Sequence, residues 1–286
     1  MRPLAEFVMK GRVQAIGVAA ISIGSVLFAW IGAAAVALVT LRKGFAQGLQ
    51  VMMWAALPAL VVSWYGDVGP LAMLLGTTAA AAVLRSTNSW PLALASVSAL
   101  GLLMVALLDQ FGGAQIDAVH QIIEGAVTQW LEQMPAEQAA LITVPTQSDV
   151  IAWLSISSAL SVVLALILGR WWQALLFNPG GFQQEFHALR IPAVVTVGLV
   201  VVALLLVQWL PEYRYAAILM AIPLLLAALG LAHALAKYWS WGKPGLSVFY
   251  AVVLLVNLSR PLLLLLAVVD SWLDVRRRLP ARDTQD

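Results

Sequence analysis

Long runs without a single Asp, Glu, Lys or Arg dominate this chain. A helix needs about 20 mainly apolar residues to cross the hydrocarbon core of a bilayer, and six uncharged runs meet or approach that length. They are Phe45–Tyr65, Val68–Leu84, Trp90–Leu108, Val150–Gly169, Ile191–Pro211 and Tyr215–Ala236. Lipid cannot satisfy the polar groups of an open backbone, so these runs predict an all-α, polytopic transmembrane helix bundle.

Composition excludes the soluble alternatives. Hydrophobic residues make up 62% of the 286 residues and charged residues only 10%, whereas a soluble domain has about half and about a quarter. We therefore expect one integral membrane domain over residues 1–286. The chain contains no cysteine, which excludes disulfides, thiolate metal sites and cysteine nucleophiles.

The charges between the runs predict the orientation in the membrane. Alternating crossings separate the flanking charges into a basic set and an acidic set. The basic set is Arg42, Lys43, Arg85, Arg170, Arg190, Lys237 and Lys243, and the acidic set is Asp67, Asp109, Asp149 and Glu212. The positive-inside rule places the basic set in the cytoplasm, with Arg214 as the exception. The expected location is the bacterial inner membrane, with several passes.

Two apolar stretches at the chain ends, Val13–Leu41 and Leu246–Val269, allow two arrangements, because each has basic residues on both flanks. As single tilted helices they give about eight crossings but leave a basic terminus outside. As bent hairpins of two half-helices they keep both termini in the cytoplasm. Gly24 with Ser25, and Ser259 to Pro261, favour the bend, whereas length favours single crossings.

The segment 110–149 contains acidic residues but no Lys or Arg, so we expect an extracytoplasmic loop. Apolar residues recur at helical spacing from Ile116 to Met134, which predicts an amphipathic surface helix. This helix is either a lid packed on the bundle or a plain acidic connector. Ser148 is the expected N-cap of the span that follows.

On the cytoplasmic side, the loop 171–190 combines a strong turn signal with a short amphipathic helix. Either this segment is a surface that binds a cytoplasmic partner, or it is a helix stop with an interfacial anchor. The residues concerned are Asn178, Gly180, Gly181, Phe182, Phe186 and Arg190. A charged tail, 276–286, begins with three arginines that suit contact with anionic lipid.

Arg260 is the strongest candidate for a binding residue, because a charge near the bilayer midplane costs at least about 2.5 kcal/mol on insertion scales. Asn257 lies one helical turn earlier on the same face, and the pair predicts a broken-helix site for an anionic solute. Alternatively, Arg260 snorkels to the surface or pairs with an acid for structural reasons. Thr77 and Thr78 are further candidates for lining a ligand cavity.

The sequence contains no motif for enzyme chemistry. It lacks a nucleophile elbow, a His-Glu-x-x-His pattern and a pair of acids within one span, so we expect no enzyme, no cofactor and no metal site. The net charge is +2, and no basic patch is interleaved with aromatic residues. Nucleic acid is therefore not an expected partner.

Three motifs together carry a family resemblance: Leu38–Gly44, Asn178–Arg190 and Asp270–Arg278. They resemble the YybS-like family of bacterial membrane proteins, a family without an assigned function. The resemblance covers nearly the whole chain. It implies a polytopic membrane protein and no particular mechanism.

A more distant resemblance is to the substrate-binding S components of energy-coupling-factor vitamin transporters. Ala15, Ala19 and Ala20 are similar to the alanine face by which S components dock on a shared transporter ATPase module. This resemblance implies that the chain binds or transports a small solute, which is the leading expectation. The alternative is a non-catalytic membrane scaffold or assembly factor that binds a cytoplasmic partner. The lipid bilayer is a partner in either case.

Overall fold

The structure is a computed structural model that describes residues 1–278, and within them it contains helices and no strand. The predicted all-α class is therefore confirmed. The N-terminal half contains α1 (Arg2–Lys10), α2 (Arg12–Gly24), α3 (Ala29–Lys43), α4 (Phe45–Trp64), α5 (Gly69–Thr87), α6 (Trp90–Phe111), α7 (Gly113–Leu131) and α8 (Ala136–Ala139). The C-terminal half contains α9 (Gln147–Phe177), α10 (Gly181–Ala188), α11 (Ala193–Trp209), η1 (Pro211–Ala217), α12 (Ile218–Tyr238), α13 (Gly242–Leu255), α14 (Ser259–Leu273) and α15 (Val275–Arg278).

Within the described residues, four helical segments are long and apolar enough to cross a membrane: α4, α6, α9, and η1 continued by α12. Two bent pairs raise the number to six if each pair is one span: α10 with α11, bent by 65°, and α13 with α14, bent by 113°. The expected total of about eight is not confirmed. The predicted span at Val68–Leu84 does form a helix, α5, but α5 is not among the helices that are long and apolar enough to cross a membrane.

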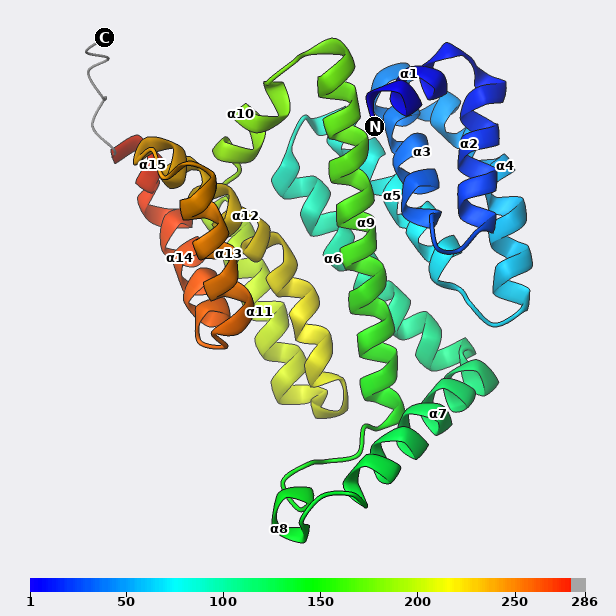
Figure 1. The fold of residues 1–286 in the computed structure, drawn as a ribbon, viewed down its shortest axis with the longest axis vertical. Helices are drawn as coiled ribbons and strands as arrows, with labels where there is room; N and C mark the ends of the chain where they lie inside the picture. The colour runs from blue at the N-terminus through cyan, green and yellow to red at the C-terminus, as the bar shows by residue number, and fades with distance from the viewer. Residues whose placement is uncertain (279–286) are drawn as a thin grey trace.

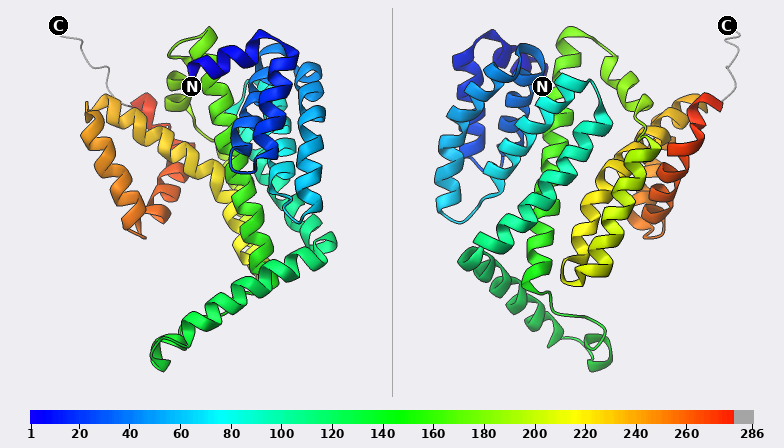
Figure 2. Two further views of the ribbon diagram at one scale, coloured as in Figure 1. Left: turned by 45° about the vertical axis from the view of Figure 1, so that its right-hand side comes forward. Right: turned by 180° about the vertical axis from the view of Figure 1, so that it is seen from behind.

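Both terminal apolar stretches are broken into two helices, at the predicted breakers. α2 ends at Gly24 and α3 begins at Ala29, and the two helices lie side by side (Figure 1). Ser25 stabilises this turn, because its hydroxyl donates to the Ser22 carbonyl at 2.7 Å and accepts from the Phe28 amide at 3.2 Å. α13 and α14 are bent by 113° at their break (Figure 2); α14 packs on α12, whereas no residue of α13 is buried. Neither stretch is thus one straight helix: the first folds back as a hairpin, and the second is bent by 113°.

α3 is the centre of the N-terminal half. Every residue from Gly32 to Leu41 is buried, and the helix packs against α2, α4, α5 and α9. Small residues permit this close approach: a Cβ on Gly169 of α9 would lie 2.7 Å from the Cβ of Ala37. Such contacts suit a membrane bundle, where helices associate by close packing and not by exclusion of water.

The two ends of the bundle differ in charge. α1, α10 and α15 lie at one end (Figure 1), which is also where α3 and α5 finish with Arg42, Lys43 and Arg85. We call this the basic end. The acidic segment with α7 and α8 lies at the opposite, acidic end. α9 joins the two ends, and at 31 residues it is about 46 Å long, well beyond the roughly 30 Å of a hydrocarbon core.

The acidic segment contains the expected helix, but this helix does not cover the bundle. Ile116 is the only buried residue of α7, which runs away from the other helices (Figure 2). The expected N-cap Ser148 is wrong by two residues, because α9 begins after Thr146. There the Thr146 hydroxyl accepts from the Asp149 amide and the Asp149 carboxylate accepts from the Thr146 amide, a reciprocal capping box.

Candidate functional site

Arg260 and Asn257 lie together at the break between α13 and α14, and both are exposed. The Arg260 guanidinium donates to the Leu254 carbonyl at 3.4 Å, so it supplies a positive charge and a donor to the C-terminus of α13. Neither residue lines any of the four cavities described for the protein. The two candidates therefore share a helix break and lie outside these four cavities.

Thr77 and Thr78 are buried in α5 and likewise line none of these cavities. The Thr78 hydroxyl donates to the Leu74 carbonyl at 2.7 Å, within its own helix. The neighbouring Gly76 and Ala79 do line a cavity of about 480 Å³ between α5, α6 and α9, whose walls are almost entirely apolar. The residues of α5 that face this space are thus offset from the predicted pair.

The small-residue face of α2 is covered by the chain itself. Ala15 and Ala19 are buried, and a Cβ on Gly32 of α3 would lie 2.7 Å from the Ala19 carbonyl oxygen. Ala15 and Ala19 are therefore not exposed to a partner, and Ala19 lies at the contact between α2 and α3, while Ala20 is half-buried.

The turn before α10 depends on two glycines. Gly180 has φ +85°, which favours glycine, and a Cβ on Gly181 would collide with the Asn178 side chain. After the turn, the Phe182 ring packs edge-on against Trp90 at 6.2 Å and the Phe186 ring against His233 at 5.5 Å. The apolar side of α10 therefore faces the bundle and not the lipid.

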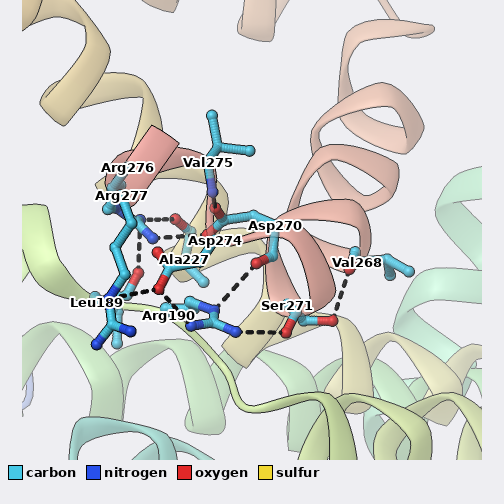
Figure 3. A network of polar contacts seen from close by, with 10 residues as sticks. All are labelled: Leu189, Arg190, Ala227, Val268, Asp270, Ser271, Asp274, Val275, Arg276 and Arg277. Atoms are coloured by element: carbon cyan, nitrogen blue, oxygen red, sulfur yellow. Dashed lines mark hydrogen bonds and ion pairs between the residues drawn. The ribbon is translucent and has the colours of Figure 1, made fainter. Parts of the chain in front are cut away.

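The end of this loop meets the C-terminal helices in a polar network (Figure 3). Arg190 binds the C-terminus of α14 through all three guanidinium nitrogens. Nη1 pairs with the Asp274 carboxylate at 2.8 Å, Nη2 donates to the Ser271 carbonyl at 2.8 Å, and Nε donates to the Asp270 carbonyl at 3.1 Å. A cation suits this position, because the last carbonyls of a helix lack partners and carry partial negative charge.

Asp270 and Arg276 form the buried part of the network. The Asp270 carboxylate is almost fully buried; it accepts from the Val275 amide at 2.9 Å and pairs with Arg276 Nη1 at 2.6 Å. Arg276 Nη2 also donates to the Leu189 carbonyl at 2.7 Å. Burial lowers the pKa of the Arg276 guanidinium, and the charge of Asp270 opposes this shift. We call Leu189, Arg190, Asp270, Ser271, Asp274 and Arg276 the C-terminal clamp.

Sequence reasoning missed most of the clamp. Arg190 was predicted as a residue for partner contact, whereas Asp270 entered as the start of a family motif; in the structure Asp270 pairs with Arg276. The available signal was the spacing of Asp270 and Asp274, which places two acids on one helical face directly before three arginines. The predicted tail 276–286 is described only to Arg278, and its remainder lies outside the described residues.

Over residues 1–278, no group of three or more His, Asp or Glu side chains is arranged to hold a metal ion. No protein-family model, curated protein or solved structure matches the chain. The resemblances to the YybS-like family and to S components therefore stay predictions. The clamp and the cavities are what the structure offers as sites.

Proposed function

We propose that this multi-pass membrane protein is a non-catalytic scaffold that holds a cytoplasmic partner at the surface around the C-terminal clamp. One observation carries the proposal: the clamp joins the connection between α10 and α11 to α14 and α15, which makes one surface from distant parts of the chain. The positive-inside rule places this basic end in the cytoplasm.

The surface has a shape and a charge that suit a protein segment with acidic residues. A groove of about 630 Å³ lies beside the clamp, lined among others by Ala188, Pro192 and Trp272. Arg277 borders the groove with 86% of its side chain exposed. Exposed charges at the rim of an interface mainly steer the partner and set specificity, while the apolar side chains of the mixed groove supply contact area.

Site-specific crosslinking tests the proposal in the native membrane. A photo-reactive residue at the exposed position Ala188 should crosslink to one defined protein, and the same residue at Gln129 of α7 should not. Arg277→Glu should lower the crosslinking yield at Ala188 several-fold, because it reverses the rim charge. Crosslinks to lipid alone, or a yield that Arg277→Glu leaves unchanged, would refute the scaffold proposal.

Binding of a small solute is a second candidate, which the apolar cavity between α5, α6 and α9 favours. Its walls suit an apolar molecule and not the anionic solute expected from Arg260. Ala79→Leu would fill part of this cavity, whereas Ala251→Leu on exposed α13 would not. Native mass spectrometry of protein purified in mild detergent should show a bound small molecule in the wild type and the Ala251→Leu variant but not in Ala79→Leu. Absence of any such molecule from the wild type would eliminate this candidate.

A further inference from the structure

A further cavity, which is polar and separate from the clamp, lies at the basic end where α3, α5, α6, α9 and α10 meet. Its volume is about 410 Å³. Its polar lining consists of Arg85, Asn88, Trp90, Arg170, Gln173 and Glu185. These residues come from α6, α9, α10 and the C-terminal end of α5, so the fold assembles the cavity from separate parts of the chain.

Most of the lining groups satisfy one another. Arg170 Nε donates to Glu185 Oε2 at 2.9 Å, and Trp90 Nε1 donates to the same oxygen at 3.1 Å. This set holds α10 against α6 and α9. Arg170 and Glu185 neutralise each other. The net charge of the cavity lining therefore comes from the one other charged residue in it.

That residue is Arg85, which pairs with no acidic side chain among residues 1–278. Its Nη1 donates to the Leu41 carbonyl, and the amide of Gln173 donates to the same oxygen at 3.3 Å. The guanidinium is therefore held in place by one nitrogen, while Nε and Nη2 have no protein acceptor in the described chain. A fixed, uncompensated guanidinium with free donors is suited to an anion.

Asn88 adds a second free group. Its backbone adopts φ +50° as the left-handed cap of α5, and its backbone N–H donates to the Leu84 carbonyl. Asn88 lines the cavity, and its side-chain amide makes no hydrogen bond within the described residues. Two N–H donors without a partner in the described chain therefore belong to a residue that lines the same cavity as Arg85.

We propose that this cavity binds a phosphate group. The forked guanidinium of Arg85 matches phosphate oxygens, the Asn88 amide supplies further donors, and the cavity lies between helices at the basic end, where such pockets receive lipid headgroups. Either the phosphodiester of an anionic lipid or a free inorganic or monoester phosphate presents this chemistry. The proposal is independent of the scaffold function, because no clamp residue lines this cavity.

The test uses the full chain purified in a neutral detergent, with two probes. One is inorganic phosphate, followed through the thermal unfolding midpoint; the other is phosphatidylglycerol against phosphatidylcholine, followed as retained lipid by native mass spectrometry. Arg85→Gln should weaken binding on the order of tenfold or more, because it removes a charge-assisted contact. Arg42→Gln is the matched control, since Arg42 lies at the same end but packs over the Phe177 ring, 4.0 Å away, outside the cavity lining.

Binding of either probe that falls in Arg85→Gln and persists in Arg42→Gln supports the proposal, and the probe that responds identifies the source of the phosphate. Equal binding by the two variants, or no binding by the wild type, overturns it. If Arg85→Gln does not fold, Asn88→Gly replaces it, because glycine keeps the left-handed cap and removes only the amide. In that case, unchanged binding by Asn88→Gly overturns the proposal.

Discussion

Replacing Arg276 with alanine should destabilise the protein much more than the same change at Arg277, although the two residues are adjacent. The Arg276 side chain is 15% exposed and pairs with Asp270, whose side chain is 2% exposed. The Arg277 side chain is 86% exposed, so its contact with Asp274 at 3.0 Å is open to solvent on the side of the arginine. Burial, and not the number of ion pairs, therefore distinguishes the two sites.

The size of the difference follows from what each change leaves behind. Arg276→Ala leaves the buried Asp270 carboxylate without its counter-charge and the Leu189 carbonyl without its donor. Removing one partner of a buried pair costs about 3–5 kcal/mol, whereas an exposed pair contributes about 0–1 kcal/mol. The free energies of unfolding of the two variants should thus differ by roughly 3 kcal/mol.

Denaturant unfolding in mild detergent, followed by tryptophan fluorescence, measures this difference, since the chain has 12 tryptophans. The double variant Asp270→Asn with Arg276→Ala is the informative control. It removes the unpaired charge as well as the arginine, so it should recover part of the lost stability. If Arg276→Ala proves no more costly than Arg277→Ala, then Asp270 does not need a buried counter-charge and the account of the clamp is wrong.

Three further predictions concern packing, strain and topology. Gly169→Ala should lower the free energy of unfolding by about 1–3 kcal/mol, because the new Cβ would lie 2.7 Å from the Cβ of Ala37. Gly125→Ala on exposed α7 is the control: its Cβ meets nothing within 4 Å, so the same unfolding assay should show no such loss. Val26→Gly should raise the free energy of unfolding by about 1 kcal/mol, because Val26 has φ +58°; a lower value would refute this strain. Since the chain has no cysteine, an impermeant maleimide should label Gln138→Cys in intact cells but Arg278→Cys only after permeabilisation, and the reverse pattern would invert the orientation.

Features that depend on local sequence were predictable. The helical class follows from uncharged runs in a medium without hydrogen-bonding solvent, and the breaks after Gly24 and before Ser259 follow from residues that interrupt helices. The choice between hairpin and single crossing was not predictable. It depends on whether the half-helices find partners: α2 packs on α3 and α4, whereas α14 packs on α12.

The sites depended on tertiary contacts that no local pattern reveals. Arg190 and Asp274 are 84 residues apart in the sequence, and Trp90 and Glu185 are 95 apart. Arg260 drew attention because a charge in an apolar run is costly, yet the structure places it at the exposed break between α13 and α14. The cost is reduced by contact with the end of α13 instead of by an enclosed ligand site.

The order of the clamp residues along the chain also bears on how the protein is made. The carbonyl of Leu189 that Arg276 binds is 87 residues earlier in the sequence. Helices that enter the membrane during synthesis can pack in order, but Asp270 gains its counter-charge only after Arg276 has been synthesised. A product that stops before Arg276 retains the buried acid and lacks the arginine. The C-terminal clamp thus couples the stability of α14 to the synthesis of the residues that follow it.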